Sequence, residues 1–129
     1  MKRSNAEYIL CNAISIYLRL QYPKVLFHWD QAGLNLSIAQ AGMNKAIQHG
    51  RGWPDLFIAE PRGRCHGLFI EVKIEGTRLV KANGEPYTPH IAEQFAVLNE
   101  LEQRGYAATF GVGFDECKKI IDAYLQNNL

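Results

Sequence analysis

Three charged residues lie within two short apolar segments of the stretch GRGWPDLFIAEPRGRCHGLFIEVKIEG. Asp55 opens the first apolar segment, and Glu71 and Lys73 lie two residues apart within the second. Carboxylates are oxygen ligands of the kind that bind Mg²⁺, and a nearby lysine can reach an attacking water or a phosphate. These residue types suit the metal-assisted hydrolysis of a phosphodiester.

The two apolar segments are rich in aromatic and branched residues, which favours a β-hairpin. A turn centred on Gly63 places Phe57 opposite Phe69. The same register places Asp55 opposite Glu71, with Cβ atoms about 5 Å apart, where like charges destabilise a sheet. A divalent cation compensates such a pair, so Mg²⁺ or Mn²⁺ is the expected cofactor.

A purely structural explanation of these residues stays open. Glu71-Val72-Lys73 on a strand is also typical of a solvated edge with an ion pair, and an aspartate after Pro54 is common in turns. Glycines ahead of Pro54 favour a site instead, because they let the backbone approach a ligand closely. Basic residues that can bind phosphates surround this site in the sequence: Arg51, Arg62, Arg64, Arg78 and Lys81.

Hydrophobic periodicity and capping signals predict the order α-β-α-β-β-α-β-α. Ser4 and Glu7 form a capping-box pattern, and Thr88-Pro89 opens the third helix with a cap and a proline. The expected helices cover about 4–22, 36–49, 89–104 and 115–129, and the expected strands about 24–29, 55–60, 67–74 and 106–113.

Composition adds weaker constraints. The chain has 129 residues and a net charge of +1, which suits one domain spanning 1–129 and does not by itself indicate a nucleic-acid binder. Between Lys45 and Lys81 there are seven Lys and Arg against four Asp and Glu. A metal that neutralised Asp55 and Glu71 would leave this segment distinctly basic.

No apolar run approaches the length of about 20 residues that spans a bilayer, so no membrane partner is expected. Cys11, Cys65 and Cys117 are odd in number and far apart, which favours free thiols in a reducing cytoplasm. The spacing of the four histidines, His28, His49, His66 and His90, does not suggest a zinc site.

Pro54-Asp55, followed by Glu71-Val72-Lys73 on the next strand, resembles the PD-(D/E)XK nuclease superfamily. That resemblance implies an α/β fold with a restriction-endonuclease-like core of order α-β-β-β-α-β, a four-stranded mixed sheet flanked by helices. The helix near 36–49 is then an insertion after the first strand. The phrases GRGWPDLFI, LFIEVK and TPHIAEQFAVLNELEQRGY are more narrowly similar to the VRR-NUC family, which includes small phage and bacterial proteins.

The resemblance covers residues 7–121 and implies roles for particular positions. Asp55, Glu71 and the carbonyl of Val72 would bind the metal, and Lys73 would assist the attacking water. Gln94 matches a glutamine on the helix after the third strand, where helical spacing also turns it inward. A buried glutamine that bonds the backbone is the alternative.

Glu7 matches an acid of the first helix that can complete such a metal site. Its helical spacing with Ile14 and Leu18 lets it face the core. The alternative for Glu7 is the capping box with Ser4. Trp53 departs from the family pattern, which has a smaller residue before the proline, and so bears on substrate access.

The function implied is that of a Mg²⁺- or Mn²⁺-dependent DNA endonuclease, acting on branched or four-way-junction DNA as a homodimer in a bacterial or phage-infected cell. The basic loops 62–64 and 78–81 would flank each site. One alternative is a non-catalytic nucleic-acid-binding module with the same fold. Another is an enzyme of small phosphate substrates, which the lack of a nucleotide-binding loop disfavours.

Overall fold

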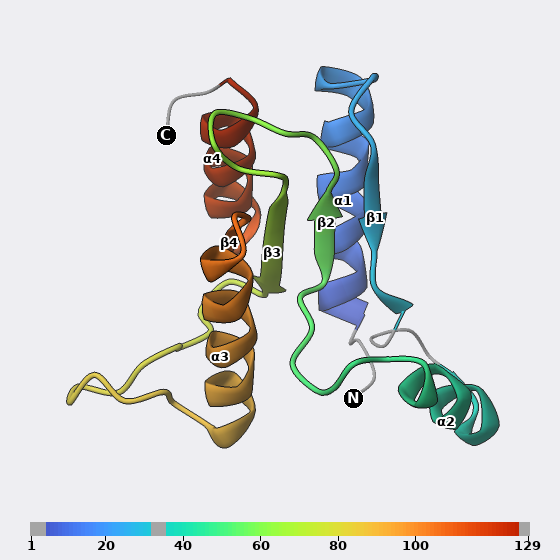
Figure 1. Cartoon of the computed structure of the whole chain (residues 1–129), viewed down its shortest axis with the longest axis vertical. Coiled ribbons are helices and arrows are strands. Elements are labelled where there is room, and N and C mark those ends of the chain that lie inside the picture. Colours follow the sequence, from blue (N-terminus) through green and yellow to red (C-terminus); the bar gives the residue numbers. More distant parts are fainter. Residues whose placement is uncertain (1–4, 32–35, 127–129) are drawn as a thin grey trace.

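The computed structural model of the protein describes residues 5–31 and 36–126, and its elements follow the predicted order (Figure 1). The helices are α1 (Asn5–Gln21), α2 (Ile38–Ala46), α3 (Pro89–Gln103) and α4 (Phe114–Leu125). The strands are β1 (Phe27–Trp29), β2 (Leu56–Ile58), β3 (Leu68–Lys73) and β4 (Ala107–Val112). The predicted capping box at Ser4 lies outside the described residues.

The first strand is shorter than predicted. The sequence suggested a start at Lys24, but the strand begins at Phe27. The N–H of Val25 donates to the carbonyl of Tyr22 at 3.0 Å, so Lys24 and Val25 belong to the turn that ends α1. Local turn formation after Pro23 thus takes the backbone groups that a longer strand would have used.

The four strands form one mixed sheet in the order β1-β2-β3-β4. The pairs β1–β2 and β2–β3 are antiparallel, whereas β3 and β4 are parallel and are connected through α3. The predicted register of the hairpin is confirmed, because Phe57 pairs with Phe69. Gly63 in the turn has a φ of +56°, the left-handed conformation that glycine adopts readily.

Helices cover both faces of this sheet. Ile70 and its neighbours of even number on β3 pack against α1 and α4, where Ile14, Leu18 and Ile121 are buried. Phe69 points to the opposite face and packs against the buried side of α3. The alternation of strand side chains therefore assigns Glu71, two residues after Phe69, to the α3 face.

Helix α3 has the predicted start and buried face. The hydroxyl of Thr88 accepts a hydrogen bond from the N–H of Ile91 at 3.1 Å, and Pro89 occupies the first turn. The buried residues of this helix are Ile91, Gln94, Leu98 and Leu101. A glutamine thus lies in an otherwise apolar stripe that contacts the sheet.

A polar contact joins the first and last helices. Asp122 Oδ1 accepts hydrogen bonds from the hydroxyls of Tyr17 at 2.6 Å and Tyr22 at 2.7 Å, and Lys118 pairs with Oδ2 at 3.2 Å. Burial raises the pKa of the Asp122 carboxyl, but these donors outweigh it and the pKa is lowered overall. Burial and Asp122 raise the pKa of Tyr17 and Tyr22, which keeps both hydroxyls as donors.

No helix among the described residues is long and apolar enough to cross a membrane. Cys11, Cys65 and Cys117 are free thiols. Burial raises the pKa of Cys117 to about 12, so this thiol stays protonated at neutral pH.

We expect Asp122→Ala to lower the free energy of unfolding by about 1–3 kcal/mol, because two partly buried hydroxyls lose their acceptor. Urea denaturation would measure this, with the exposed acid Asp115→Ala on the same helix as the control. Because the pKa of Asp122 is lowered by folding, its contribution is present above the ordinary value of 3.8 and is lost as the pH falls through the folded pKa. Equal losses in the two variants would contradict this role.

Candidate active site

The predicted acids meet where β2 begins and β3 ends. Because the two strands are antiparallel, Asp55 just before β2 lies beside the end of β3. The start of β2 and the end of β3 form the lower edge of the sheet in Figure 1. The last ladder pair is Leu56 with Ile70, and Asp55 and Glu71 occupy the next position. Asp55 Oδ2 accepts a hydrogen bond from the N–H of Val72 at 2.9 Å. The aspartate is thereby fixed to the backbone between Glu71 and Lys73.

Glu71 lies on an inner strand and is buried. Its side chain is 4% exposed, between the equally buried Phe69 on β3 and Phe110, its Cα partner on β4. The alternative of a solvated edge is therefore wrong for Glu71, which is buried on an inner strand of the sheet. Burying a carboxylate costs several kcal/mol unless a compensating charge or hydrogen bonds are present. A divalent cation bound here would supply such a charge.

The donor set fits a hard divalent cation. Asp55 and Glu71 offer carboxylate oxygens on adjacent strands, the chemistry that Mg²⁺ and Mn²⁺ prefer. Within residues 5–31 and 36–126, no three His, Cys, Asp or Glu side chains gather in a metal-binding arrangement. The ligands of the cation would thus be two carboxylates, a main-chain carbonyl, water and substrate phosphate. This set of ligands is common for Mg²⁺.

The segment before Asp55 packs tightly against α3. Gly52 has a φ of +85°, and a Cβ there would lie 2.9 Å from the carbonyl oxygen of Glu93. Only glycine fits both the conformation and this close approach. Trp53, 41% exposed, lies edge-on to Phe69 with ring centroids 5.4 Å apart. Residues 50–54, which we call the lead-in, are thus held against α3, and the ring of Trp53 is partly exposed at the surface.

Gln94 is buried on the same side of the sheet. Its side chain is 5% exposed, and Nε2 lies 3.2 Å from Nε2 of His90, one turn earlier on α3. Oε1 is buried and has no hydrogen-bond partner in the described part of the chain. The alternative of a glutamine satisfied by the backbone is not supported, because the bond of this side chain is to a histidine.

His90 is the residue that sequence reasoning missed. Burial lowers its pKa, and the positive charges of Lys73 and Arg51 lower it further, while Glu93 opposes them. A neutral imidazole can accept a hydrogen bond from the Gln94 amide through Nε2. The spacing of four residues between His90 and Gln94 was the available signal, but the sequence analysis considered His90 only as a zinc ligand.

Three of the predicted DNA-binding residues lie at the same end as the acids. Arg51 belongs to the lead-in and pairs with Glu93 at 3.3 Å. Arg78 and Lys81 lie on the segment that leaves β3 and projects beside the start of α3 (Figure 1). The predicted turn at Asn83-Gly84 is confirmed, since the N–H of Gly84 bonds the carbonyl of Lys81 at 2.9 Å.

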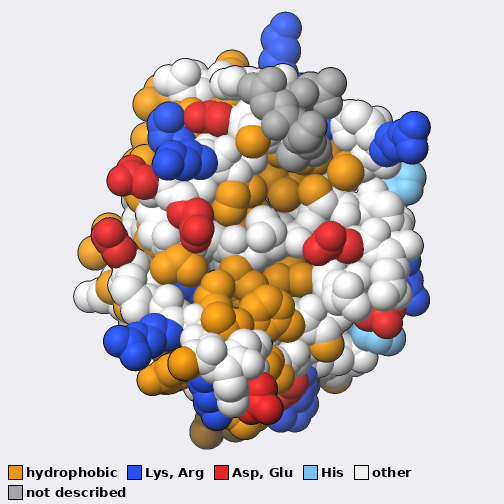
Figure 2. All heavy atoms as spheres, turned by 90° about the vertical axis from the view of Figure 1, so that its left-hand side faces the viewer, with side chains coloured by type: hydrophobic (Ala, Val, Ile, Leu, Met, Phe, Trp, Pro, Cys, Tyr) orange, Lys and Arg blue, Asp and Glu red, His pale blue; other side chains and the backbone are white. Residues whose placement is uncertain are grey.

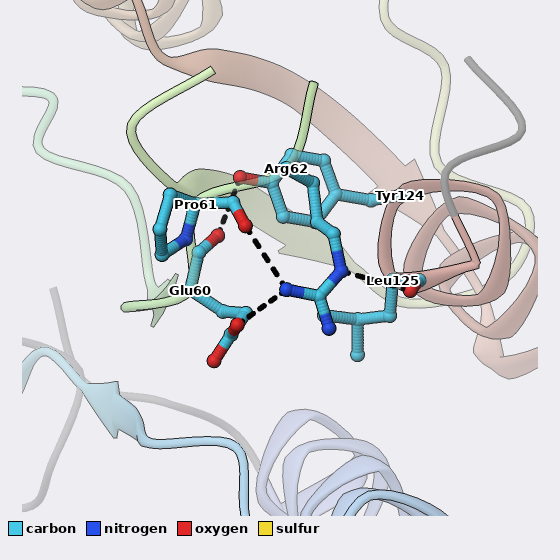
Figure 3. Close-up of polar contacts among 5 residues, drawn as sticks. All are labelled: Glu60, Pro61, Arg62, Tyr124 and Leu125. Carbon is cyan, nitrogen blue, oxygen red and sulfur yellow. Dashed lines mark hydrogen bonds and ion pairs between the residues drawn. The ribbon is translucent and has the colours of Figure 1, made fainter. Parts of the chain in front are cut away.

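The other two predicted DNA-binding residues lie at the opposite end of the hairpin. Arg62 and Arg64 belong to the β2–β3 turn, six to seven residues from Glu71 along β3, which is about 20 Å at the rise of a β-strand. Arg62 forms an ion pair with Glu60 and donates through Nε to the carbonyl of Leu125 at 3.0 Å (Figure 3). The expectation that loop 62–64 flanks the acids is wrong, because a hairpin turn and its open end lie at opposite edges of a sheet.

Glu7 occupies the first turn of α1 and is half-buried. It precedes the buried residues Cys11 and Ile14 at helical spacing, as predicted. The start of α1 lies toward the same end of the molecule as Asp55 (Figure 1). The described residues nevertheless hold no cluster in which Glu7, Asp55 and Glu71 join as three ligands.

The side of the molecule that carries α3 and α4 does not form a uniform basic surface. Figure 2 shows hydrophobic side chains near its middle, with Lys and Arg side chains interspersed with Asp and Glu around them. Mixed charge of this kind attracts phosphate weakly.

The fold defined by this sheet and these helices is the expected α/β class, a four-stranded mixed sheet with helices on both faces. A solved structure described as a "VRR_NUC domain protein" shares it, with a TM-score of 0.68 and 24% sequence identity, over 96% of this chain and 91% of that one. No family model matches the chain, and no curated protein does. The likeness establishes the fold, and the roles of individual residues rest on the geometry above.

We expect the pKa of His90 to lie below its ordinary value of 6.5 and to rise in Lys73→Met, because the lysine charge disfavours imidazolium. NMR titration of the histidine resonances would measure it, with Lys119→Met on α4 as the control. Since folding lowers this pKa, His90 reduces stability as the pH falls below 6.5. An unchanged titration in Lys73→Met would show that the two groups do not interact.

Proposed function

We propose that this protein is a Mg²⁺- or Mn²⁺-dependent endonuclease of the VRR-NUC type that hydrolyses phosphodiester bonds in DNA. The observation that carries the proposal is the buried Glu71 on an inner strand, beside Asp55 and two residues before Lys73. A structural ion pair does not require burial on an inner strand, whereas a metal site sheltered from water does. The VRR_NUC domain neighbour supports the same reading of the fold.

Each residue has a task in this mechanism. Asp55, Glu71 and the carbonyl of Val72 would hold the cation, which lowers the pKa of bound water and stabilises charge on the phosphate. The bond from Val72 N–H to Asp55 fixes the aspartate for that task. Lys73 would donate to the attacking water or to a phosphate oxygen as negative charge develops there.

Gln94 and Glu7 would support the site in different ways. The buried side-chain oxygen of Gln94, Oε1, has no hydrogen-bond partner among the described residues. Gln94 lies on the face of the sheet that carries Glu71. Its amide is oriented by His90. Glu7, half-buried at the start of α1, would contact the site through water, because no three-acid cluster forms with it.

The substrate is proposed to be branched DNA, such as a four-way junction, cut by a homodimer. One chain supplies one site, and symmetric cleavage of two strands needs two sites related by a two-fold axis. Arg51, Arg78 and Lys81 would bind backbone phosphates near the cut, which positions DNA without reading its sequence. A non-catalytic DNA-binding module is the alternative, and the presence of Asp55, Glu71 and Lys73 together disfavours it.

We expect Asp55→Asn and Glu71→Gln each to reduce cleavage at least about 100-fold while the protein stays folded, since the shapes are kept and only charge is lost. The assay uses labelled linear, flap and four-way-junction DNA with Mg²⁺, Mn²⁺ or chelator. Glu102→Gln, an exposed acid of α3, is the control. Full activity in either variant, or activity in chelator, would contradict the mechanism, and a large fall in melting temperature would favour a structural role.

We expect Lys73→Ala to lower kcat about 100-fold with little change in DNA affinity, because the lysine acts on charge that develops in the transition state. Lys81→Ala is the matched variant, and it should weaken binding with little effect on kcat. Single-turnover cleavage and fluorescence anisotropy separate the two effects. If Lys73→Ala acts wholly through KM, the lysine binds phosphate and does not assist the water.

A further inference from the structure

A shallow cavity lies between the segment that leaves β3 and the start of α3. Its volume is about 270 Å³, and its lining combines a cation, a carboxylate, an aromatic ring and apolar side chains. We call it the α3 cavity, and the residues that matter below are Lys81, Glu85, Pro86, Tyr87, Pro89 and Ala92. Ligand pockets run from about 300 Å³ upward, so this cavity suits one ring system and not a large molecule.

Backbone hydrogen bonds hold one wall of the α3 cavity in place. The N–H of Tyr87 donates to the carbonyl of Leu79 at 2.9 Å, and the N–H of Lys81 donates to the carbonyl of Glu85 at 2.8 Å. Leu79 packs against the core on the α3 face of the sheet. The segment 79–87 is therefore a small ribbon fixed to the body of the protein, and it projects beside the start of α3 (Figure 1).

The α3 cavity and the candidate active site share the first turns of α3. Ala92 lines the cavity. The next residue, Glu93, lies against the lead-in, where a Cβ on Gly52 would be 2.9 Å from its carbonyl oxygen. Gly52 in turn precedes Asp55 closely in the chain. The cavity thus lies at the same end of the sheet as the acids, within reach of a DNA strand that is cut there.

The chemistry of the lining matches a nucleotide. Tyr87 is 45% exposed and offers a ring on which a base can stack. Lys81 supplies a positive charge for the adjoining phosphate, and Glu85 can accept a hydrogen bond from the exocyclic amino group of adenine or cytosine. Pro86 and Pro89 add apolar surface. A site for phosphate alone would need neither the ring nor the carboxylate.

The start of the helix does not itself form this site. The hydroxyl of Thr88 already accepts a hydrogen bond from the N–H of Ile91 at 3.1 Å, and Pro89 has no N–H to offer an anion. Recognition therefore depends on the side chains of segment 79–87. Because neighbouring bases cover both faces of a base inside a duplex, only an unpaired base can be splayed out onto Tyr87.

We propose that the α3 cavity binds one unpaired nucleotide of a DNA substrate, with its base stacked on Tyr87 and its phosphate bound by Lys81. The inference rests on the proposed function, because it takes DNA as the substrate. It deepens that function by naming the feature that distinguishes branched DNA from a duplex, an unpaired nucleotide close to the cut. Glu85 adds a preference for adenine or cytosine over thymine, which has no exocyclic amino group.

Removal of single bases tests the cavity directly. Fluorescence anisotropy in Ca²⁺, with the DNA checked for integrity on a gel, measures affinity for 5′- and 3′-flap DNA. Each unpaired base near the branch is replaced in turn by an abasic sugar. At one position the replacement should weaken binding by the wild type about 10-fold and leave binding by Tyr87→Leu unchanged. Tyr87→Phe keeps the ring and should behave as the wild type.

Tyr8→Leu is the matched control, because Tyr8 is an exposed tyrosine of α1, the helix on the other face of the sheet. It should respond to abasic sugars as the wild type does, and thermal melting checks that each variant stays folded. Thymine at the sensitive position should bind several-fold more weakly than adenine, and Glu85→Ala should remove that difference. Equal binding of the two bases by the wild type overturns the role of Glu85.

The outcomes separate this inference from the nuclease function. Cleavage in Mg²⁺, with no abasic position that distinguishes the wild type from Tyr87→Leu, overturns the cavity site and leaves the nuclease. An abasic effect that Tyr87→Leu abolishes, without cleavage in any metal, supports the cavity site and contradicts the nuclease. Failure to bind any DNA overturns both. Binding of free dAMP at Tyr87 without an abasic effect overturns the assignment to DNA.

Discussion

The burial of one carboxylate, that of Glu71, is the constraint on which this architecture depends. An inner strand between two aromatic residues is a costly place for a negative charge. Everything nearby is arranged around that position: Asp55 is fixed beside it by the N–H of Val72, Lys73 follows on the same face, and α3 covers it.

Glycine and aromatic residues make that burial possible without closing the site. Gly52 lets the lead-in approach the carbonyl of Glu93 within a distance that any Cβ would block. Trp53 then lies edge-on to Phe69 and remains 41% exposed.

Much of the fold was predictable because it depends on local rules. Alternation fixed the faces of β3, and the glycine at the turn fixed the pairing of Phe57 with Phe69. The start of α3 followed from Thr88 and Pro89. These features need only the chemistry of neighbouring residues, which a sequence displays directly.

The wrong or missed predictions concern residues whose contacts are made by distant parts of the chain. Arg62 looked like a free cation, but the end of α4 supplies an acceptor that the sequence does not reveal. His90 was missed because its pKa is lowered by burial and then by Lys73, seventeen residues away, and the sequence displays neither. The periodicity of α2 predicted a helix correctly, yet periodicity cannot tell whether an apolar face meets the protein's own core or a partner. Only the three-dimensional position of the rest of the chain shows whether such a face is covered by the protein itself.

The two ends of the hairpin therefore have different physical tasks. At the turn, Arg62 bonds the carbonyl of Leu125, and the hydroxyl of Tyr124 donates to the carbonyl of Glu60 at 2.6 Å (Figure 3). These bonds anchor β2 and β3 to α4, where Tyr124 is fully buried. At the other end the same strands carry the acids, and α2 and the segment after β3 project beyond them. Because one end is anchored firmly, the sheet and not the projecting segments sets the positions of Asp55 and Glu71.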